Sequence, residues 1–275
     1  MDGGQSAGLG QDIVDSKPID APPLIGKVHE GFWDALNTIW DKLVAAVGAL
    51  KTAYPDEAIY VTGHSKGGPM ATIGAARLLG VETLSVAKVI TFASPHPGNG
   101  DFVTNYPKSI PVRRYENYLD IVPFLPPTDT FYEVINSLLP ASAKAWFCST
   151  FPSICNALEH ASEWDYTPLG ELLYVDDKGE ILHQGDFYAR PLVRLLEIIY
   201  TLAGWTWDAN AAMELEGLKA MTQSQGEAKL SVSGLSRIGA AHCIGCECDK
   251  ADNLCAGGYM KGAGGDGVCV DYVCK

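Results

Sequence analysis

The side chain of this sequence best placed for chemistry is a serine between two glycines. It lies in Gly63-His64-Ser65-Lys66-Gly67, which follows a β-branched apolar run and precedes a helical pattern. A sharp turn from a strand into a helix presents its apical side chain at the strand end, and we expect a Cβ atom at Gly63 or Gly67 to strike the neighbouring strand or helix. N–H groups at a helix start can hold an oxyanion. We therefore predict Ser65 as a nucleophile and the backbone N–H of Lys66 as an oxyanion donor, rather than a solvated serine in a glycine-rich loop.

A serine nucleophile also needs a histidine that takes its proton and a carboxylate that orients the histidine. Asp120 is the leading carboxylate because it follows the strand-like residues 112–116 and opens Asp120-Ile121-Val122-Pro123. Its alternative role is to cap a turn before the prolines. The residues alone leave the choice of base open. The histidines that follow Asp120 in the chain are His160, His183 and His242.

The elements that must position these residues alternate between strands and helices. Apolar residues recur at helical spacing in residues 31–54, and Pro55 ends this pattern. The alternation favours an α/β fold with a mainly parallel sheet covered by helices on both faces, whose functional residues gather at the carboxyl ends of the strands. Ser65 and Asp120 lie at such ends. We predict strands at 58–62, 88–93 and 112–116, helices at 31–54, 67–79 and 190–202, and a hairpin of 172–175 with 180–183.

We expect one α/β domain with a segment attached at each end. Residues 1–27 are rich in Gly, Asp and Pro and are expected to be extended, and residues 28–235 form the domain. Within it, residues 128–164 are predicted to be a helical insertion, which either covers a substrate pocket or packs on the sheet. Residues 236–275 lose periodicity and are expected to form a cysteine-rich tail packed on the same domain.

Charge and composition restrict the classes of molecule that this protein is expected to bind. The formal charge is −13 although only 19% of residues are charged, so the acidity comes from few Lys and Arg. Such a surface argues against nucleic acid and anionic membranes. We find no run of about 18 apolar residues, so we expect no membrane-spanning helix. The chemistry above requires no metal or organic cofactor, and the expected partner is a small-molecule substrate.

The cysteines favour disulfides and an oxidising, extracellular compartment. Cys148 and Cys155 form a local pair, and zinc at the Cys243-x-x-Cys246 spacing or free thiols are the alternatives for the tail. The first eight residues lack the basic and apolar regions of a signal peptide. A chain that has lost its natural start would reconcile this with the cysteines. The cysteines of the tail are Cys243, Cys246, Cys248, Cys255, Cys269 and Cys274.

Four motifs lie within residues 28–126: Val28-His29-Glu30-Gly31-Phe32, residues 62–68, Thr91-Phe92-Ala93-Ser94-Pro95 and Asn117-Tyr118-Leu119-Asp120. Through these motifs residues 28–126 as a whole resemble the class 3 lipases, the fungal-lipase-like branch of the α/β-hydrolases. The resemblance implies an α/β-hydrolase fold and a serine carboxylic-ester hydrolase that cleaves acylglycerols or short-chain esters through an acyl-enzyme, with transient contact to lipid surfaces. Feruloyl esters and phospholipids are the alternative substrates. A weaker match to the family follows at residues 170–175.

The resemblance also implies which histidine is the base. The order Ser, Asp, His places the base after the acid, and His242 with Gly257-Gly258-Tyr259 resembles the family's terminal His-x-x-x-Tyr region at wider spacing. His242 is therefore the preferred base, and His183, which ends a strand-like run, is the runner-up. The family's earlier strand ending in Phe-Arg-Gly-Thr, which supplies an oxyanion donor, has no counterpart before Val28. The alternative is that this protein is a noncatalytic relative of the family, which has lost this strand and binds lipid or a protein partner.

Overall fold

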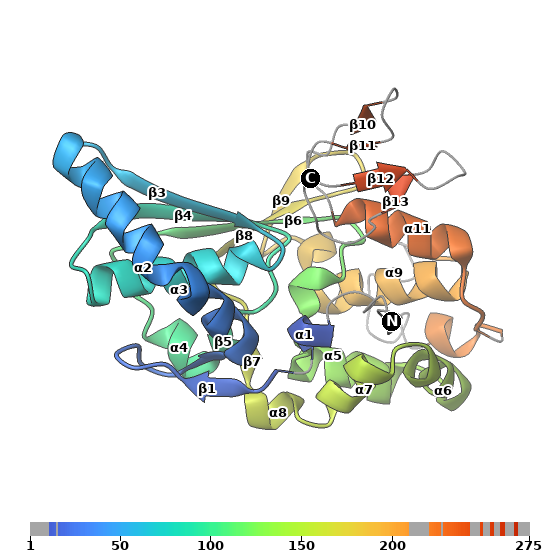
Figure 1. Ribbon diagram of the computed structural model, residues 1–275. Coiled ribbons are helices and arrows are strands. Elements are labelled where there is room, and N and C mark those ends of the chain that lie inside the picture. The colour runs from blue at the N-terminus through green and yellow to red at the C-terminus, as the bar shows by residue number, and fades with distance from the viewer. Residues whose placement is uncertain are drawn as a thin grey trace, which may run out of the picture. The chain divides into compact units, whose positions relative to one another are not determined.

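The computed structural model describes residues 11–14, 16–208, 220–226 and 228–242, together with short strands further along the chain. Figure 1 shows its helices and strands, which form two compact units. The first unit comprises Met1–Arg114, Phe124–Asp129 and Phe151–Glu171. The second comprises Tyr115–Pro123, Thr130–Thr150 and Leu172–Lys275. Strand β6 (Val112–Asn117) carries the chain from the first unit into the second.

The first unit is built around two parallel strands and their crossover helix. Strands β3 (Ile59–His64) and β4 (Val86–Phe92) pair in parallel, and α3 (Gly67–Gly80) connects them. Helix α2 (Glu30–Ala53) packs on α3, where the side chains of Leu36 and Trp40 lie close to Gly74. These elements lie close to their predicted bounds, so the prediction of an α/β fold with parallel strands is confirmed.

A cation–π contact also joins these two helices. The Arg77 guanidinium of α3 lies 4.0 Å from the ring centre of Trp40 and 4.8 Å from that of Trp33, both on α2. Its Nη1 atom donates to the side-chain oxygen of Asn37. A planar guanidinium on aromatic faces can both pack and remain charged. Arg77 therefore fastens α2 to the helix that follows the candidate nucleophile.

A second, antiparallel sheet in the first unit was not predicted. Its strand order is β1-β2-β5-β7. The N-terminal part, which was expected to be extended, joins this sheet and also forms helix α1 (Gln11–Val14) among its described residues. Buried Ile13 and Val14 and the hydrogen bond from Tyr166 Oη to Ser16 O hold this part in place. The strands are β1 (Pro18–Asp20), β2 (Lys27–His29), β5 (Gly98–Asn99) and β7 (Tyr166–Thr167).

The second unit contains the predicted hairpin and two long helices. Strands β8 (Glu171–Val175) and β9 (Ile181–His183) pair antiparallel, as predicted. Helix α9 (Pro191–Ala203) is buried on most sides and packs against α11 (Val232–Ala241). Helix α11 continues five residues beyond position 236, where periodicity was expected to end. Its apolar Ile238 and Ala241 are buried, which explains why the helix persists.

No helix among the described residues is long and apolar enough to span a membrane.

Helices also occupy most of residues 129–164, and the tail contains short strands. The helices are α5 (Asp129–Glu133), the π-helix η3 (Val134–Leu138), α6 (Ala141–Thr150), α7 (Pro152–Leu158) and α8 (Ala161–Trp164). Other short elements are α4 (Gly100–Thr104), η2 (Val122–Phe124), η4 (Phe187–Ala189), β10 (Cys248–Asp249), β11 (Leu254–Cys255), β12 (Tyr259–Lys261) and β13 (Gly267–Val268).

The close approach of α9 and α11 depends on one glycine. A Cβ atom at Gly234 of α11 would overlap the backbone carbonyl of Thr201 in α9. The start of α11 is fixed beside it, because Ser231 Oγ accepts from Gly234 N at 3.0 Å and Ser231 N donates to Leu202 O at 2.8 Å. The position of α11 is therefore set by direct backbone contact with α9.

Replacing Gly234 tests this contact. We expect Gly234→Ala to lower the free energy of unfolding by about 1–3 kcal/mol, because the added methyl group forces the helices apart. The matched control is Gly48→Ala in α2, where an added Cβ meets no atom within 4 Å. That change is expected to stabilise by about 0.5–1 kcal/mol, since alanine is the better helix former. Urea unfolding compares the two variants, and equal midpoints would contradict the packing argument.

Candidate active site

Ser65 lies at the junction of β3 and α3 with an unusual backbone conformation. Its φ angle is +52°, in the left-handed region, and only 3% of its surface is exposed. Its N–H donates to Phe92 O at 2.9 Å, and its carbonyl accepts from Gly68 N at 2.8 Å. Such a conformation costs a non-glycine residue on the order of 1–3 kcal/mol and persists only where the surroundings hold it. The hydrogen bonds to β4 and to the first turn of α3 hold Ser65 in this conformation.

The glycines around Ser65 have unequal roles. A Cβ atom at Gly63 would overlap the carbonyl of Gly67, so Gly63 must be small. A Cβ at Gly67 would meet no atom within 4 Å, so the prediction that both motif glycines are sterically required is wrong for Gly67. The second constrained position is Gly68, whose Cβ would strike the side chain of Ser94. The loop after β4, rather than the motif itself, creates this restriction.

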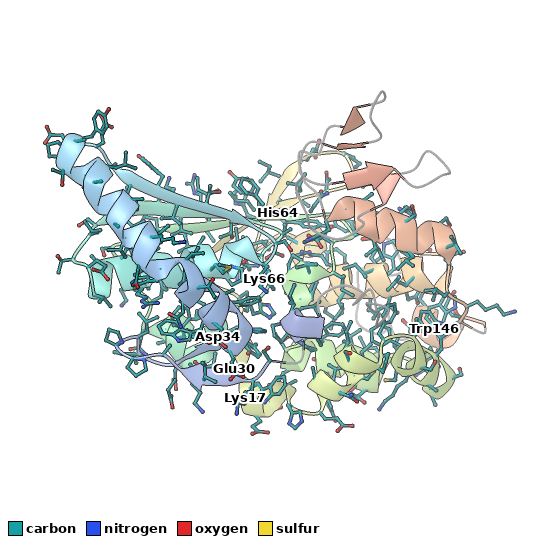
Figure 2. All side chains as sticks on the ribbon, in the orientation of Figure 1. Lys17, Glu30, Asp34, His64, Lys66 and Trp146 are labelled. Atoms are coloured by element: carbon teal, nitrogen blue, oxygen red, sulfur yellow. The ribbon has the colours of Figure 1, made fainter. Side chains whose placement is uncertain are left out.

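Lys66 directly precedes α3. It occupies the N-cap position with φ −49° and ψ −31°, and its side chain is labelled in Figure 2. The first N–H groups of a helix have no partner within the helix and point toward its N-terminal end. The expected role of the Lys66 backbone N–H as an oxyanion donor fits this position and stays a prediction.

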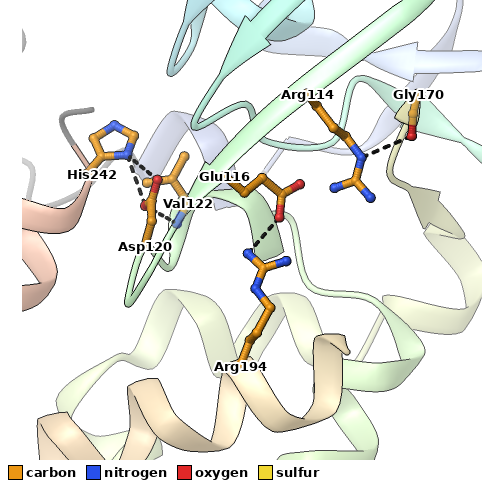
Figure 3. A network of polar contacts seen from close by, with 7 residues as sticks. All are labelled: Arg114, Glu116, Asp120, Val122, Gly170, Arg194 and His242. Carbon is orange, nitrogen blue, oxygen red and sulfur yellow. Dashed lines mark hydrogen bonds and ion pairs between the residues drawn. The ribbon is translucent and has the colours of Figure 1, made fainter. Parts of the chain in front are cut away.

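Asp120 and His242 meet in the second unit although 122 positions separate them (Figure 3). Nδ1 of His242 lies 3.0 Å from Oδ1 and 3.1 Å from Oδ2 of Asp120. Both side chains are almost completely buried. Because a carboxylate only accepts hydrogen bonds, Nδ1 carries the proton and Nε2 is left as the basic atom. The arrangement can orient an imidazole and stabilise its charged form.

The backbone next to Asp120 fixes the orientation of the Asp120 carboxylate. Leu119 has φ +61°, and Oδ1 of Asp120 also accepts from Val122 N at 3.0 Å. The residue after β4, Ala93, likewise has φ +50°. A left-handed residue therefore follows β3 and β4 directly and lies two positions beyond β6. These bends redirect the chain where parallel strands of α/β folds carry functional residues.

A buried ion pair lies in the same network as the Asp120–His242 pair (Figure 3). Arg194 Nη2 of α9 lies 2.7 Å from Glu116 Oε2 of β6, with 4% and 2% of the side chains exposed. The guanidinium also lies 4.4 Å from the ring centre of Tyr174. Burial lowers the pKa of Arg194 to about 10, and nearby Tyr174 and Asp120 oppose the fall. Arg194 therefore stays charged at neutral pH.

Two other histidines have structural roles in the first unit. His29 stacks on Phe32 with ring centres 3.9 Å apart, and its Nε2 donates to Ile13 O at 3.1 Å. His96 is buried, and its Nδ1 donates to Pro126 O at 2.9 Å. Burial lowers the pKa of His96 to about 4, so its imidazole is neutral near pH 7. Both side chains connect segments distant in the sequence.

The remaining candidates for the base lie at exposed positions. His183 ends β9, and its backbone N–H donates to Asp186 Oδ2 at 2.7 Å. His160 stacks on Trp164 and contacts Glu163 at 3.2 Å. The structure thus brings the imidazole of His242 to Asp120 and that of His160 to Glu163, whereas the bond at His183 is made by its backbone N–H.

The cysteines of the predicted local pair, Cys148 and Cys155, are both disulfide-bonded. The side chains of the six tail cysteines lie outside the described residues, and with them the choice between disulfides and zinc. Among the residues whose side chains are described, no group of three His, Cys, Asp or Glu residues is arranged to hold a metal ion.

A strand, a serine with positive φ and a helix together have the form of a nucleophile elbow, the strand–turn–helix junction typical of the α/β-hydrolases. More narrowly, residues 9–130 match the family model described as Lipase (class 3). The predicted resemblance to the class 3 lipases is therefore confirmed over this part of the chain.

Two relatives of this chain are fungal lipases. A lipase of Rhizomucor miehei is 41% identical over 40% of this chain and 32% of its own length. A secreted mono- and diacylglycerol lipase of Fusarium solani is 39% identical over 36% of this chain and 30% of its own. A solved structure of the Rhizomucor miehei triacylglyceride lipase is 25% identical, with a TM-score of 0.47 and coverage of 66% and 62%. The match to the two sequence relatives spans about a third of their length.

The sequence prediction missed the polar residues that surround the Asp120–His242 pair. Glu116 is a buried carboxylate on the partly exposed strand β6, and Arg194 interrupts an otherwise apolar face of α9. A charged residue inside an apolar helical run is a recognisable signal, because burial of a charge requires a partner. The partner itself cannot be identified from one sequence.

Burial brings the pKa of one carboxyl group beside α11 close to neutral pH. Tyr118 hydrogen-bonds Glu197 of α9 and accepts from Arg237 Nη2 of α11 at 3.2 Å. Burial raises the pKa of Glu197 to about 7, the bond from Tyr118 opposes this rise, and the charge of Asp177 adds to it. Between about pH 4.5 and pH 7 the folded protein therefore holds a proton on Glu197 that the unfolded chain releases.

This proton gives a prediction for stability against pH. The contribution of Glu197 is fully present below its unfolded pKa and is lost as the pH rises through about 7. From pH 5 to pH 8 we expect the wild type to lose about 1–3 kcal/mol relative to Glu197→Gln, which has no proton to lose. Urea unfolding at both pH values measures the difference. Exposed Glu159→Gln is the control, and a similar pH response in both variants would contradict the assignment.

Proposed function

We propose that this protein is a serine carboxylic-ester hydrolase that cleaves acylglycerols or short-chain esters. The observation that carries the proposal is the buried contact of His242 Nδ1 with Asp120 at 3.0 Å, which leaves Nε2 basic. The strained Ser65 at the nucleophile elbow supports it. Catalysis of this type requires no metal or organic cofactor.

The proposed reaction proceeds through an acyl-enzyme. The Ser65 hydroxyl attacks the ester carbonyl while His242 Nε2 takes its proton, and Asp120 stabilises the imidazolium. The Lys66 backbone N–H holds the tetrahedral oxyanion. The intermediate then collapses, and His242 returns the proton to the departing alcohol. Water, deprotonated by His242, attacks the acyl-enzyme, and the acid leaves as the bond to Ser65 Oγ breaks and His242 returns the proton to that oxygen.

The relatives support the substrate class and the compartment. One is named a lipase, and another is named a secreted mono- and diacylglycerol lipase. We propose that this protein also acts on acylglycerol-type lipid esters outside the cell, with transient contact to lipid surfaces. The disulfide-bonded Cys148 and Cys155 fit an oxidising compartment. Feruloyl esters and phospholipids stay alternatives within the same chemistry.

Removing the nucleophile tests the enzyme reading. We expect Ser65→Ala to lower hydrolysis of p-nitrophenyl butyrate by about 10⁴-fold or more, because no other group supplies the covalent step. A fluorophosphonate probe should label the wild type at Ser65 and leave the variant unlabelled. A wild type that neither hydrolyses the ester nor reacts with the probe would favour the noncatalytic alternative.

The acid and base assignments have their own test. We expect Asp120→Asn to lower kcat by about 10³–10⁴-fold, because an amide no longer fixes the imidazole tautomer. His242→Ala should abolish turnover, whereas His183→Ala should retain wild-type kcat and KM for p-nitrophenyl butyrate. Activity in His242→Ala together with loss in His183→Ala would overturn the assignment.

A further inference from the structure

The segment that carries Asp120 contacts the end of α11 at several points. Asn117 Nδ2 donates to Ala241 O at 2.9 Å. Arg237 Nη2 donates to Tyr118 Oη at 3.2 Å, and Asp120 Oδ1 accepts from His242 Nδ1 at 3.0 Å. The carboxylate and the imidazole are therefore parts of a larger contact between the end of β6 and the last turns of one helix.

The Asn117 bond acts on the peptide group that joins Ala241 to His242. Ala241 is the last residue of α11, and the final carbonyls of a helix have no partner within the helix. The N–H of the same peptide group belongs to His242 and donates to Ala240 O. This planar group is thus held from both sides, and the Cα of His242 is attached directly to it. Fixing the plane fixes the direction in which the imidazole leaves the backbone.

The opposite face of β6 is held as well. Successive side chains of a strand point to opposite faces, so Glu116 faces away from Asn117 and pairs with Arg194 of α9. Helix α9 in turn contacts α11 at Gly234. The end of β6 is therefore anchored, and the side-chain amide of Asn117 projects from it as a donor in a fixed place. Its bond to Ala241 O can hold the end of α11 in position.

We propose that Asn117 is a positioning residue that holds His242 against Asp120 by fixing the Ala241–His242 peptide group. The catalytic consequence rests on the proposed function, whereas the orientation of the imidazole does not. Without the amide donor, the end of α11 can rotate. The contact with Asp120 then weakens, and Nε2 loses its fixed direction.

The test compares two asparagines whose side-chain amides each donate to a backbone carbonyl of a helix. Asn105 Nδ2 donates to Asp101 O at 2.9 Å at the end of α4, within the first unit. We expect Asn117→Ala to lower kcat for p-nitrophenyl butyrate by about 10²-fold with little change in KM, since a small misplacement of a catalytic group has effects of that size. Asn105→Ala should retain the wild-type kcat.

A second readout follows the imidazole without catalysis. In an NMR titration of ¹⁵N-histidine-labelled protein, the His242 signal is identified by its loss in His242→Gln. We expect its midpoint to move to lower pH in Asn117→Ala, because a weaker carboxylate contact stabilises the imidazolium less. Wild type and Asn105→Ala should share one midpoint. This readout separates positioning from a general loss of stability.

The outcomes are distinct. If Asn117→Ala does not fold, Asn117→Asp keeps the shape but offers no donor at pH 8, and it should also lower kcat. Wild-type kcat and midpoint in Asn117→Ala, or equal losses in both asparagine variants, would overturn the proposal. If the wild type is inactive toward the ester and the probe, the proposed function fails, while a midpoint shift confined to Asn117→Ala would still support the positioning role.

Discussion

The second unit depends on a hydrogen bond between a carboxylate and an imidazole that are both removed from water. Burying such groups is costly unless every polar atom finds a partner. Asp120 accepts from His242 and from Val122 N, and the peptide group before His242 is held by Asn117. The surrounding structure can therefore be understood as the set of contacts that makes this burial tolerable.

The same unit keeps compensating charges close to that pair. Arg194 and Glu116 neutralise one another, and Arg194 also interacts electrostatically with Asp120. A buried ion pair adds little stability by itself, but losing one partner leaves a charge without compensation. The arrangement ties α9 to β6 and makes the geometry around Asp120 sensitive to either partner.

Much of the first unit could be predicted from the sequence because its signals are local. Turn residues and apolar periodicity located β3, Ser65 and α3, and the same kind of pattern located Asp120. The β1-β2-β5-β7 sheet was missed because strands of two or three residues leave no periodicity. The role of Gly67 was misjudged because the restriction at Gly68 comes from Ser94, a contact across the fold. Preference for His242 required family resemblance, since 122 positions separate it from Asp120.

His96 gives the first unit an acid sensitivity of its own. Its pKa falls from 6.5 in the unfolded chain to about 4 when burial removes it from water. Between about pH 4 and pH 6.5 His96 is protonated in the unfolded chain and neutral in the folded unit. Acidification therefore favours unfolding. Glu197 in the second unit responds in the opposite direction, toward alkali. A buried imidazole therefore lowers the stability of the first unit toward acid, and a buried carboxyl group lowers that of the second unit toward alkali.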